Sequence, residues 1–72
     1  MALVVEDDHD FAAELVRILA AEGWSAASTS EGAAAVDHVR ERSPDLVLLD
    51  LMLPDIDGVD VLRRIRAFSD AY

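Results

Sequence analysis

The stretch LVLLDLMLPDIDG, which runs from Leu46 to Gly58, is the most informative part of the chain. Four apolar residues lead to Asp50, and a second apolar run ends at Pro54 before a polar turn. A short apolar run bounded by turn residues is typical of a buried strand. An unpaired carboxylate at the end of such a strand is costly, so we expect Asp50 to have a partner.

Three apolar segments with strand character alternate with three segments of helical periodicity. The predicted strands are Ala2–Val5, Trp24–Ser28 and Leu46–Leu49. The predicted helices follow Asp8, run from Ala33 to Arg42, and begin after Gly58. Strands that alternate with helices of about ten residues indicate βαβ crossovers and a parallel sheet, which places the chain in the α/β class.

The spacing of apolar residues predicts which side of each helix faces the core. In the first helix the predicted core stripe is Phe11, Leu15, Ile18 and Leu19. In the later helices the apolar residues at helical spacing are Ala33, Val36 and Val39, and then Val59, Leu62 and Ile65. Asp8 or Asp10 is suited to cap the first helix, and Gly23 is placed to end it as a left-handed residue.

Acidic residues follow two of the predicted strands. Glu6, Asp7 and Asp8 come directly after the first strand, and Asp50 comes directly after the third. Because ligands collect at the carboxyl ends of parallel strands, we expect these acids to converge. Helix capping alone explains Asp8 and Asp10. Glu6, Asp7 and Asp50 would repel one another without a cation, and they predict a Mg²⁺ site at which a carboxylate can accept a phosphoryl group.

This pattern resembles that of a two-component response-regulator receiver domain. The resemblance rests on LVVEDDHD at the first strand end and on LVLLDLMLPDIDG at the third, and it covers the whole chain. It implies that Asp50 accepts the phosphoryl group, that Asp7 binds Mg²⁺ directly, and that Glu6 reaches the metal through water. The further positions that it assigns are the metal-binding backbone carbonyl of Met52 and the loop-shaping residues Pro54 and Gly58.

The resemblance also implies a fold. Receivers are similar to flavodoxin, with a doubly wound parallel sheet of five strand–helix units in the order 2-1-3-4-5. The 72 residues supply three of these units, which implies the order 2-1-3 and the N-terminal part of a receiver domain, residues 1–72. The family's hydroxyl residue and lysine at the ends of the fourth and fifth strands have no counterpart in a chain without Lys. We therefore expect the 72 residues alone not to be competent for phosphorylation.

The implied function is that of a signalling module rather than an enzyme. Asp50 would take a phosphoryl group from a sensor histidine kinase or a phosphotransfer protein, and the added charge would switch an output surface. The Glu-Asp-Asp form of the acidic pocket is similar to that of receivers joined to winged-helix DNA-binding domains. The alternative is a Mg²⁺-dependent phosphotransfer enzyme of the haloacid-dehalogenase kind, or a toprim-like enzyme. The first would need an acid at Met52, and the second an Asp-x-Asp directly after a strand.

Composition limits the partners of this segment. The chain has 15 acidic residues against six basic ones and a net charge of −9, which argues against direct binding of nucleic acid or of an anionic membrane. The absence of Cys suits a reducing cytoplasm. In the order 2-1-3, Leu46–Leu49 forms a sheet edge, and its unpaired backbone groups favour self-association.

Overall fold

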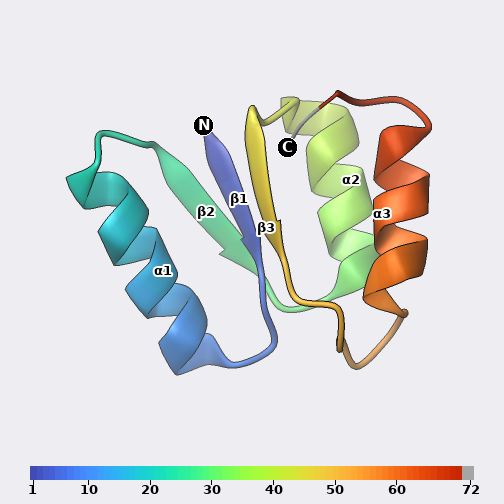
Figure 1. The fold of residues 1–72 in the computed structure, drawn as a ribbon, viewed down its shortest axis with the longest axis horizontal. Helices are drawn as coiled ribbons and strands as arrows, with labels where there is room; N and C mark the ends of the chain where they lie inside the picture. Colours follow the sequence, from blue (N-terminus) through green and yellow to red (C-terminus); the bar gives the residue numbers. More distant parts are fainter. Residues whose placement is uncertain (71–72) are drawn as a thin grey trace.

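The three strands of the chain form one parallel sheet with helices on both faces, in a computed structural model that describes residues 1–70 (Figure 1). The elements are β1 (Ala2–Val5), α1 (His9–Ala21), β2 (Ala26–Thr29), α2 (Gly32–Arg42), β3 (Leu46–Leu49) and α3 (Gly58–Arg66). The predicted α/β class and alternation are confirmed. The second strand begins at Ala26 rather than Trp24, because its pairing with β1 starts there.

The sheet has the strand order β2-β1-β3, as the family resemblance implies. The strands run in step, with Val5 opposite Thr29 on one side and Leu49 on the other. All three strands therefore end at the same level, and the segments that follow them gather at one end of the sheet (Figure 1). β1 lies in the centre, and β3 is an edge strand in the part of the chain that the structure describes.

Local signals determine the two ends of α1. The carboxylate of Asp8 accepts hydrogen bonds from the N–H groups of Asp10 and Phe11, both at 3.1 Å. Of the two predicted caps, Asp8 is therefore the one that is used. Gly23 follows the helix in the left-handed conformation predicted for it, with a φ of 92°.

The main core lies between the sheet and helices α2 and α3. It is formed by Leu3, Val5, Ala35, Val36, Val39, Val61 and Ile65. Because side chains alternate along a strand, Leu3 and Val5 of β1 point into this core, whereas Val4 points to the face on which α1 lies. Val36 and Val39 are buried as predicted, and Ala33 is exposed. We call the two sides of the sheet the α2–α3 face and the α1 face.

The predicted core stripe of α1 is wrong in part. Phe11 is 53% exposed and Ile18 is 50% exposed, Leu15 and Leu19 are half-buried, and Ala12 is the buried residue of this helix. The reason is the position of the helix, which packs against β1 and β2. The neighbouring surface of β3 has no helix over it in residues 1–70, so Phe11 and Leu15 border a groove instead of a core.

The inward side of α3 also differs from the predicted one. Val61 and Ile65 are buried, whereas Val59 and Leu62 are 42% and 46% exposed. This helix lies beside α2 (Figure 1), and its buried residues also join the core cluster that contains Leu3 and Val5 of β1. Its inward side is therefore set by two neighbours, and Val61 packs at the start of α2 next to Gly32.

Candidate functional site

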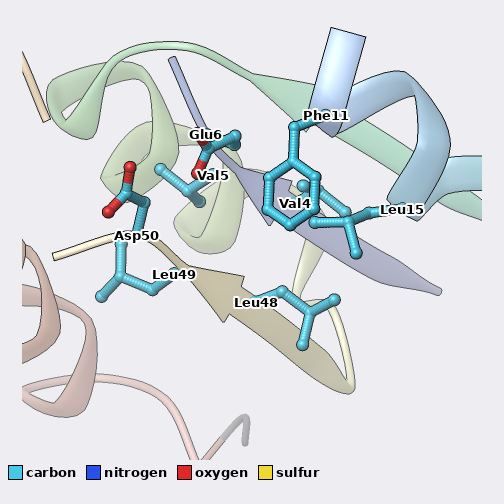
Figure 2. Close-up of a pocket in the computed structure, with 8 residues that line it drawn as sticks. All are labelled: Val4, Val5, Glu6, Phe11, Leu15, Leu48, Leu49 and Asp50. Atoms are coloured by element: carbon cyan, nitrogen blue, oxygen red, sulfur yellow. The ribbon is translucent and has the colours of Figure 1, made fainter. Parts of the chain in front are cut away.

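Two acidic side chains are placed one residue beyond the ends of adjacent strands. The N–H of Asp50 donates to the carbonyl of Val5 at 2.9 Å, and the N–H of Glu6 donates to the carbonyl of Thr29 at 3.0 Å. The hydrogen bonding of the sheet thus continues past β3 and β1 and holds the backbone of both acids. Figure 2 shows their carboxyl groups side by side at the end of the sheet.

A third carboxyl group completes the cluster. Glu6, Asp7 and Asp50 each present an oxygen atom within 4.8 Å of the others, and we call these residues the acidic cluster. Glu6 and Asp50 are half-buried, and Asp7 is exposed. A set of carboxylate oxygens open to water suits Mg²⁺, which binds through one or two carboxylates and keeps several waters. The residues present therefore fit this cation.

The crowding of negative charge is evident at Glu6. Burial raises the pKa of its carboxyl group, and Asp50 raises it further through a hydrogen bond and through repulsion. Asp7 adds repulsion, whereas the N–H of Asp8, which donates to Glu6 at 3.3 Å, lowers the pKa. A cation among these groups would relieve the repulsion and favour the ionised form of Glu6.

The other acids of this region serve the helix. Asp8 directs its carboxylate to the start of α1, and Asp10 lies in the first turn of the same helix. Within the described residues, neither belongs to the acidic cluster. The structure thus separates Asp8, which caps the helix, from the acidic cluster, and metal binding by that cluster stays a prediction.

The loop that follows β3 folds back on itself. The Oδ1 atom of Asp50 accepts a hydrogen bond from the N–H of Met52 at 3.0 Å, and Met52 pairs with Asp57 in an isolated antiparallel bridge. The N–H of Gly58 donates to the carbonyl of Leu51 at 3.1 Å. A Cβ atom at Gly58 would lie 2.4 Å from the Cα of Leu51, so no side chain fits at this position. This close approach supports the loop-shaping role predicted for Gly58.

Met52 and Pro54 are both exposed within this loop. The side chain of Met52 is 83% exposed, whereas its backbone is held by the hydrogen bond to Asp50 and by the bridge to Asp57. The backbone of Met52 is thus the part of the residue that the loop positions. Its role as a metal ligand, and the loop-shaping role of Pro54, stay predictions.

An apolar groove leads from the acidic cluster along the α1 face of the sheet (Figure 2). It has a volume of about 540 Å³. Val4 and Leu48 of the sheet form its floor, and Phe11 and Leu15 of α1 form one wall. Asp50, the candidate phosphoryl acceptor, therefore lies where the acidic cluster meets the apolar groove.

The sheet order and the acids at the strand ends define a class of signalling domain. The family model for the response regulator receiver domain matches residues 2–72, and the chain belongs to this family. It is thus a signalling module rather than a classical enzyme, and the dehalogenase-like and toprim-like alternatives are not favoured. In residues 1–70 no helix combines the length and the apolar character needed to span a membrane.

Similar proteins include DNA-binding regulators. The DNA-binding response regulator MtrA of Mycobacterium tuberculosis strain H37Rv is 51% identical over 67 residues, which are 93% of this chain and 29% of MtrA. The transcriptional regulatory protein BaeR of Escherichia coli O6:H1 is 43% identical over 68 residues, which are 94% of this chain and 28% of BaeR. The chain therefore spans less than a third of the length of these curated relatives.

Solved receiver domains have the same fold. The BeF3-activated N-terminal receiver domain of Klebsiella pneumoniae RstA matches with a TM-score of 0.87 and 31% identity, over 93% of this chain and 57% of that chain. A CheY-like receiver domain from Methylobacillus flagellatus matches with a TM-score of 0.90 and 30% identity, over 99% of this chain and 61% of that chain. The flavodoxin-like fold predicted from the sequence is confirmed.

One residue near the site is not indicated by the sequence. Asp55 has the pattern of a polar turn residue, but both of its carboxylate oxygens accept hydrogen bonds from the start of α2, at Gly32 and Ala33. A weak signal was available, because Glu31 occupies the N-cap position of α2 and glutamate is not a preferred cap. The helix therefore needed a cap from elsewhere in the chain.

Proposed function

We propose that Asp50 is the phosphoryl acceptor of this receiver domain. The observation that carries the proposal is the position of its carboxylate, one residue past β3, in a cluster with Glu6 and Asp7 whose oxygens lie within 4.8 Å of one another. The backbone hydrogen bond from Asp50 to Val5 holds the acceptor in place. Family membership supports the same role, because receivers use an aspartate after the third strand.

The proposed reaction is a transfer from a phosphohistidine. A carboxylate oxygen of Asp50 attacks phosphorus, the phosphorus–nitrogen bond breaks, and the leaving imidazole nitrogen keeps the bonding electron pair. The product is an acyl phosphate, and later attack by water on phosphorus returns the carboxylate and releases inorganic phosphate. The chain itself holds Asp50 at the carboxyl end of the strands, where its half-buried carboxylate is accessible to solvent.

We infer that Mg²⁺ binds at the acidic cluster through Asp7 and Asp50, through the backbone carbonyl of Met52, and through a water held by Glu6. The three clustered carboxylates and the raised pKa of Glu6 support this inference. When bound, the cation neutralises negative charge on the phosphoryl oxygens during transfer.

The partners follow from the family. We propose that residues 1–72 form the N-terminal part of a receiver domain that works in the cytoplasm and takes its phosphoryl group from a sensor histidine kinase or a phosphotransfer protein. The name of MtrA, a DNA-binding response regulator, supports a C-terminal DNA-binding domain, and the resemblance of the Glu-Asp-Asp pocket supports one of the winged-helix kind. Direct contact with DNA or a membrane is not proposed for the acidic segment itself.

The test is phosphorylation of the complete receiver domain by acetyl phosphate with Mg²⁺, detected by mass spectrometry of the intact protein. Asp50→Asn is expected to abolish the added phosphoryl group. Asp45→Asn is a matched control, because Asp45 is an exposed carboxylate that precedes β3 at the other end of the strand, and it should be labelled fully. Undiminished phosphorylation of Asp50→Asn would contradict the proposal.

A further inference from the structure

The start of α2 is capped by a distant residue. Glu31 stands at the N-cap position and makes no side-chain hydrogen bond to the helix. Asp55 takes over this task, since its Oδ1 accepts from the N–H of Gly32 at 2.7 Å and its Oδ2 accepts from the N–H of Ala33 at 3.0 Å. The first N–H groups of a helix lack partners within the helix and carry partial positive charge, so a carboxylate binds them well.

The same contact joins three elements on the α2–α3 face. A Cβ atom at Gly32 would lie 2.6 Å from Val61 of α3 and 2.8 Å from Ile56 of the loop. The start of α2 therefore sits directly against both side chains, with no space for movement toward them. Asp55 and Ile56 together attach the middle of the loop to α2 by polar and apolar contacts.

The attached loop is the one that carries the site. Met52 and Asp57 pair with each other, which makes the residues between them, Asp55 included, a closed turn. At the base of this turn, the N–H of Met52 donates to the carboxylate of Asp50. A shift of Asp55 away from α2 would thus move the turn, and with it the backbone of Met52 relative to Asp50.

We propose that Asp55 is a positioning residue for the site, which holds the turn between Met52 and Asp57 against α2 and so sets the place of the Met52 backbone beside Asp50. This inference rests on the proposed function of the acidic cluster, and it adds a residue that touches neither metal nor phosphate. The backbone N–H groups of Ala33 and Gly32 lower the pKa of Asp55, so the capping carboxylate is charged at neutral pH.

The experiment distinguishes two roles of Asp55, namely capping α2 and attaching the turn between Met52 and Asp57 to that helix. Asp55→Ala removes both the cap and this attachment, which we call the link. Adding Glu31→Asp to that variant supplies a preferred cap at the N-cap position of α2, where the backbone is already extended (φ −129°, ψ 141°), and restores no link to the loop. Glu31→Ala is the control, since this exposed side chain makes no cap bond.

Two quantities are measured on the complete receiver domain, namely Mg²⁺ affinity by calorimetry and stability by urea denaturation. Asp55→Ala is expected to weaken Mg²⁺ binding about tenfold, as is common when a residue that supports a metal ligand is lost. The double variant should regain stability but keep the weakened affinity. Asp55→Asn, which retains one acceptor oxygen, should show an intermediate loss and serves if Asp55→Ala does not fold.

Two results would overturn the proposal. One is a Mg²⁺ affinity in Asp55→Ala or Asp55→Asn equal to that of the unchanged domain, and the other is full recovery of affinity in the double variant. Asp7→Asn tests the proposed metal site independently of Asp55. Unchanged Mg²⁺ binding in Asp7→Asn would contradict the proposed metal site, whereas weakened binding there with no effect at Asp55 would contradict the positioning role alone.

Discussion

The two faces of the sheet are covered to different degrees, although the same central strand serves both. On the α2–α3 face, Leu3 and Val5 of β1 belong to a continuous buried cluster. On the α1 face, Val4 and Leu48 form the floor of a groove. A helix is about 10–12 Å wide and strands lie about 4.8 Å apart, so one helix covers about two strands. Two helices cover three strands, and one helix leaves β3 bare.

The largest expected effect compares the same substitution on the two faces. Ile65 is 3% exposed in the core of the α2–α3 face, and Ile18 of α1 is 50% exposed. Ile65→Ala should lower the unfolding free energy of the chain by about 3 kcal/mol, because it removes buried methyl groups and leaves a cavity. Ile18→Ala should cost less than about 1 kcal/mol, because half of that side chain already contacts water.

The measurement for this pair is urea denaturation followed by circular dichroism, at a concentration at which the midpoint does not depend on dilution. Similar costs at the two positions would contradict the comparison. They would mean that the outer side of α1 is covered in solution.

The next largest expected effect is on self-association through β3, the edge strand that no helix covers on the α1 face in the described residues. We expect the 72-residue chain to self-associate through β3, because an apolar edge strand has unpaired backbone groups and Leu48 faces the open groove. Leu48→Lys should weaken association at least about tenfold, or about 1.4 kcal/mol, since a charge would have to be buried in the contact.

Sedimentation equilibrium measures this association. Leu62→Lys makes the same change at an exposed position of α3, away from the edge strand, and it should leave association unchanged. If the 72-residue chain without substitutions sediments as a single monomeric species, the edge strand β3 does not pair with a second copy.

The smallest effect is on pH dependence, and it has opposite signs at two acids. The N–H groups of α2 lower the pKa of Asp55 in the folded chain, so its contribution to stability is fully present above the unfolded value and is lost as pH falls through the folded pKa. Burial raises the pKa of Glu6, so its contribution is present below the unfolded value and is lost as pH rises through the folded pKa.

Asp55→Asn should therefore flatten the loss of stability below about pH 4, where aspartate titrates. Glu6→Gln should remove the part of the stability that falls as pH rises above that range. Denaturation midpoints measured without metal at several pH values test both expectations. An acid limb unaltered by Asp55→Asn would mean that this carboxylate does not favour the folded state.

The sequence was sufficient for the convergence of the acids, because parallel strands finish at the same end of the sheet and acids placed directly after them gather there. The strand order 2-1-3 came from the family resemblance. Glu6 and Asp50 are placed by backbone hydrogen bonds to Thr29 and Val5 that extend the strands by one residue. Family resemblance supplied the position of each strand and the role of each acid.

Which side of each helix is buried could be determined only from the structure. Periodicity shows which residues share a side of a helix, but the partner opposite decides which side is buried. In α3, Val59 and Leu62 form one apolar side and Val61 and Ile65 another, and contact with α2 selects the second. In α1, Phe11 has the expected spacing but no partner element beside it in the described residues.

Asp55 could not be assigned from the sequence for a different reason. Its partner Gly32 lies 23 residues earlier in the chain, on another element. An aspartate after proline is equally well explained by turn chemistry within the loop. Only the packing of the loop against α2 shows which of the two explanations applies.

The absence of a side chain at Gly58 has a mechanical consequence. Its Cα is so close to the backbone of Leu51 and to the carbonyl of Asp50 that an added Cβ would lie 2.4 Å from one and 2.8 Å from the other. The backbone of Asp50 and the first residue of α3 are therefore in contact without an intervening side chain. A displacement of the Asp50 backbone toward Gly58 would therefore press directly on the start of α3, since no side chain of Gly58 lies between them.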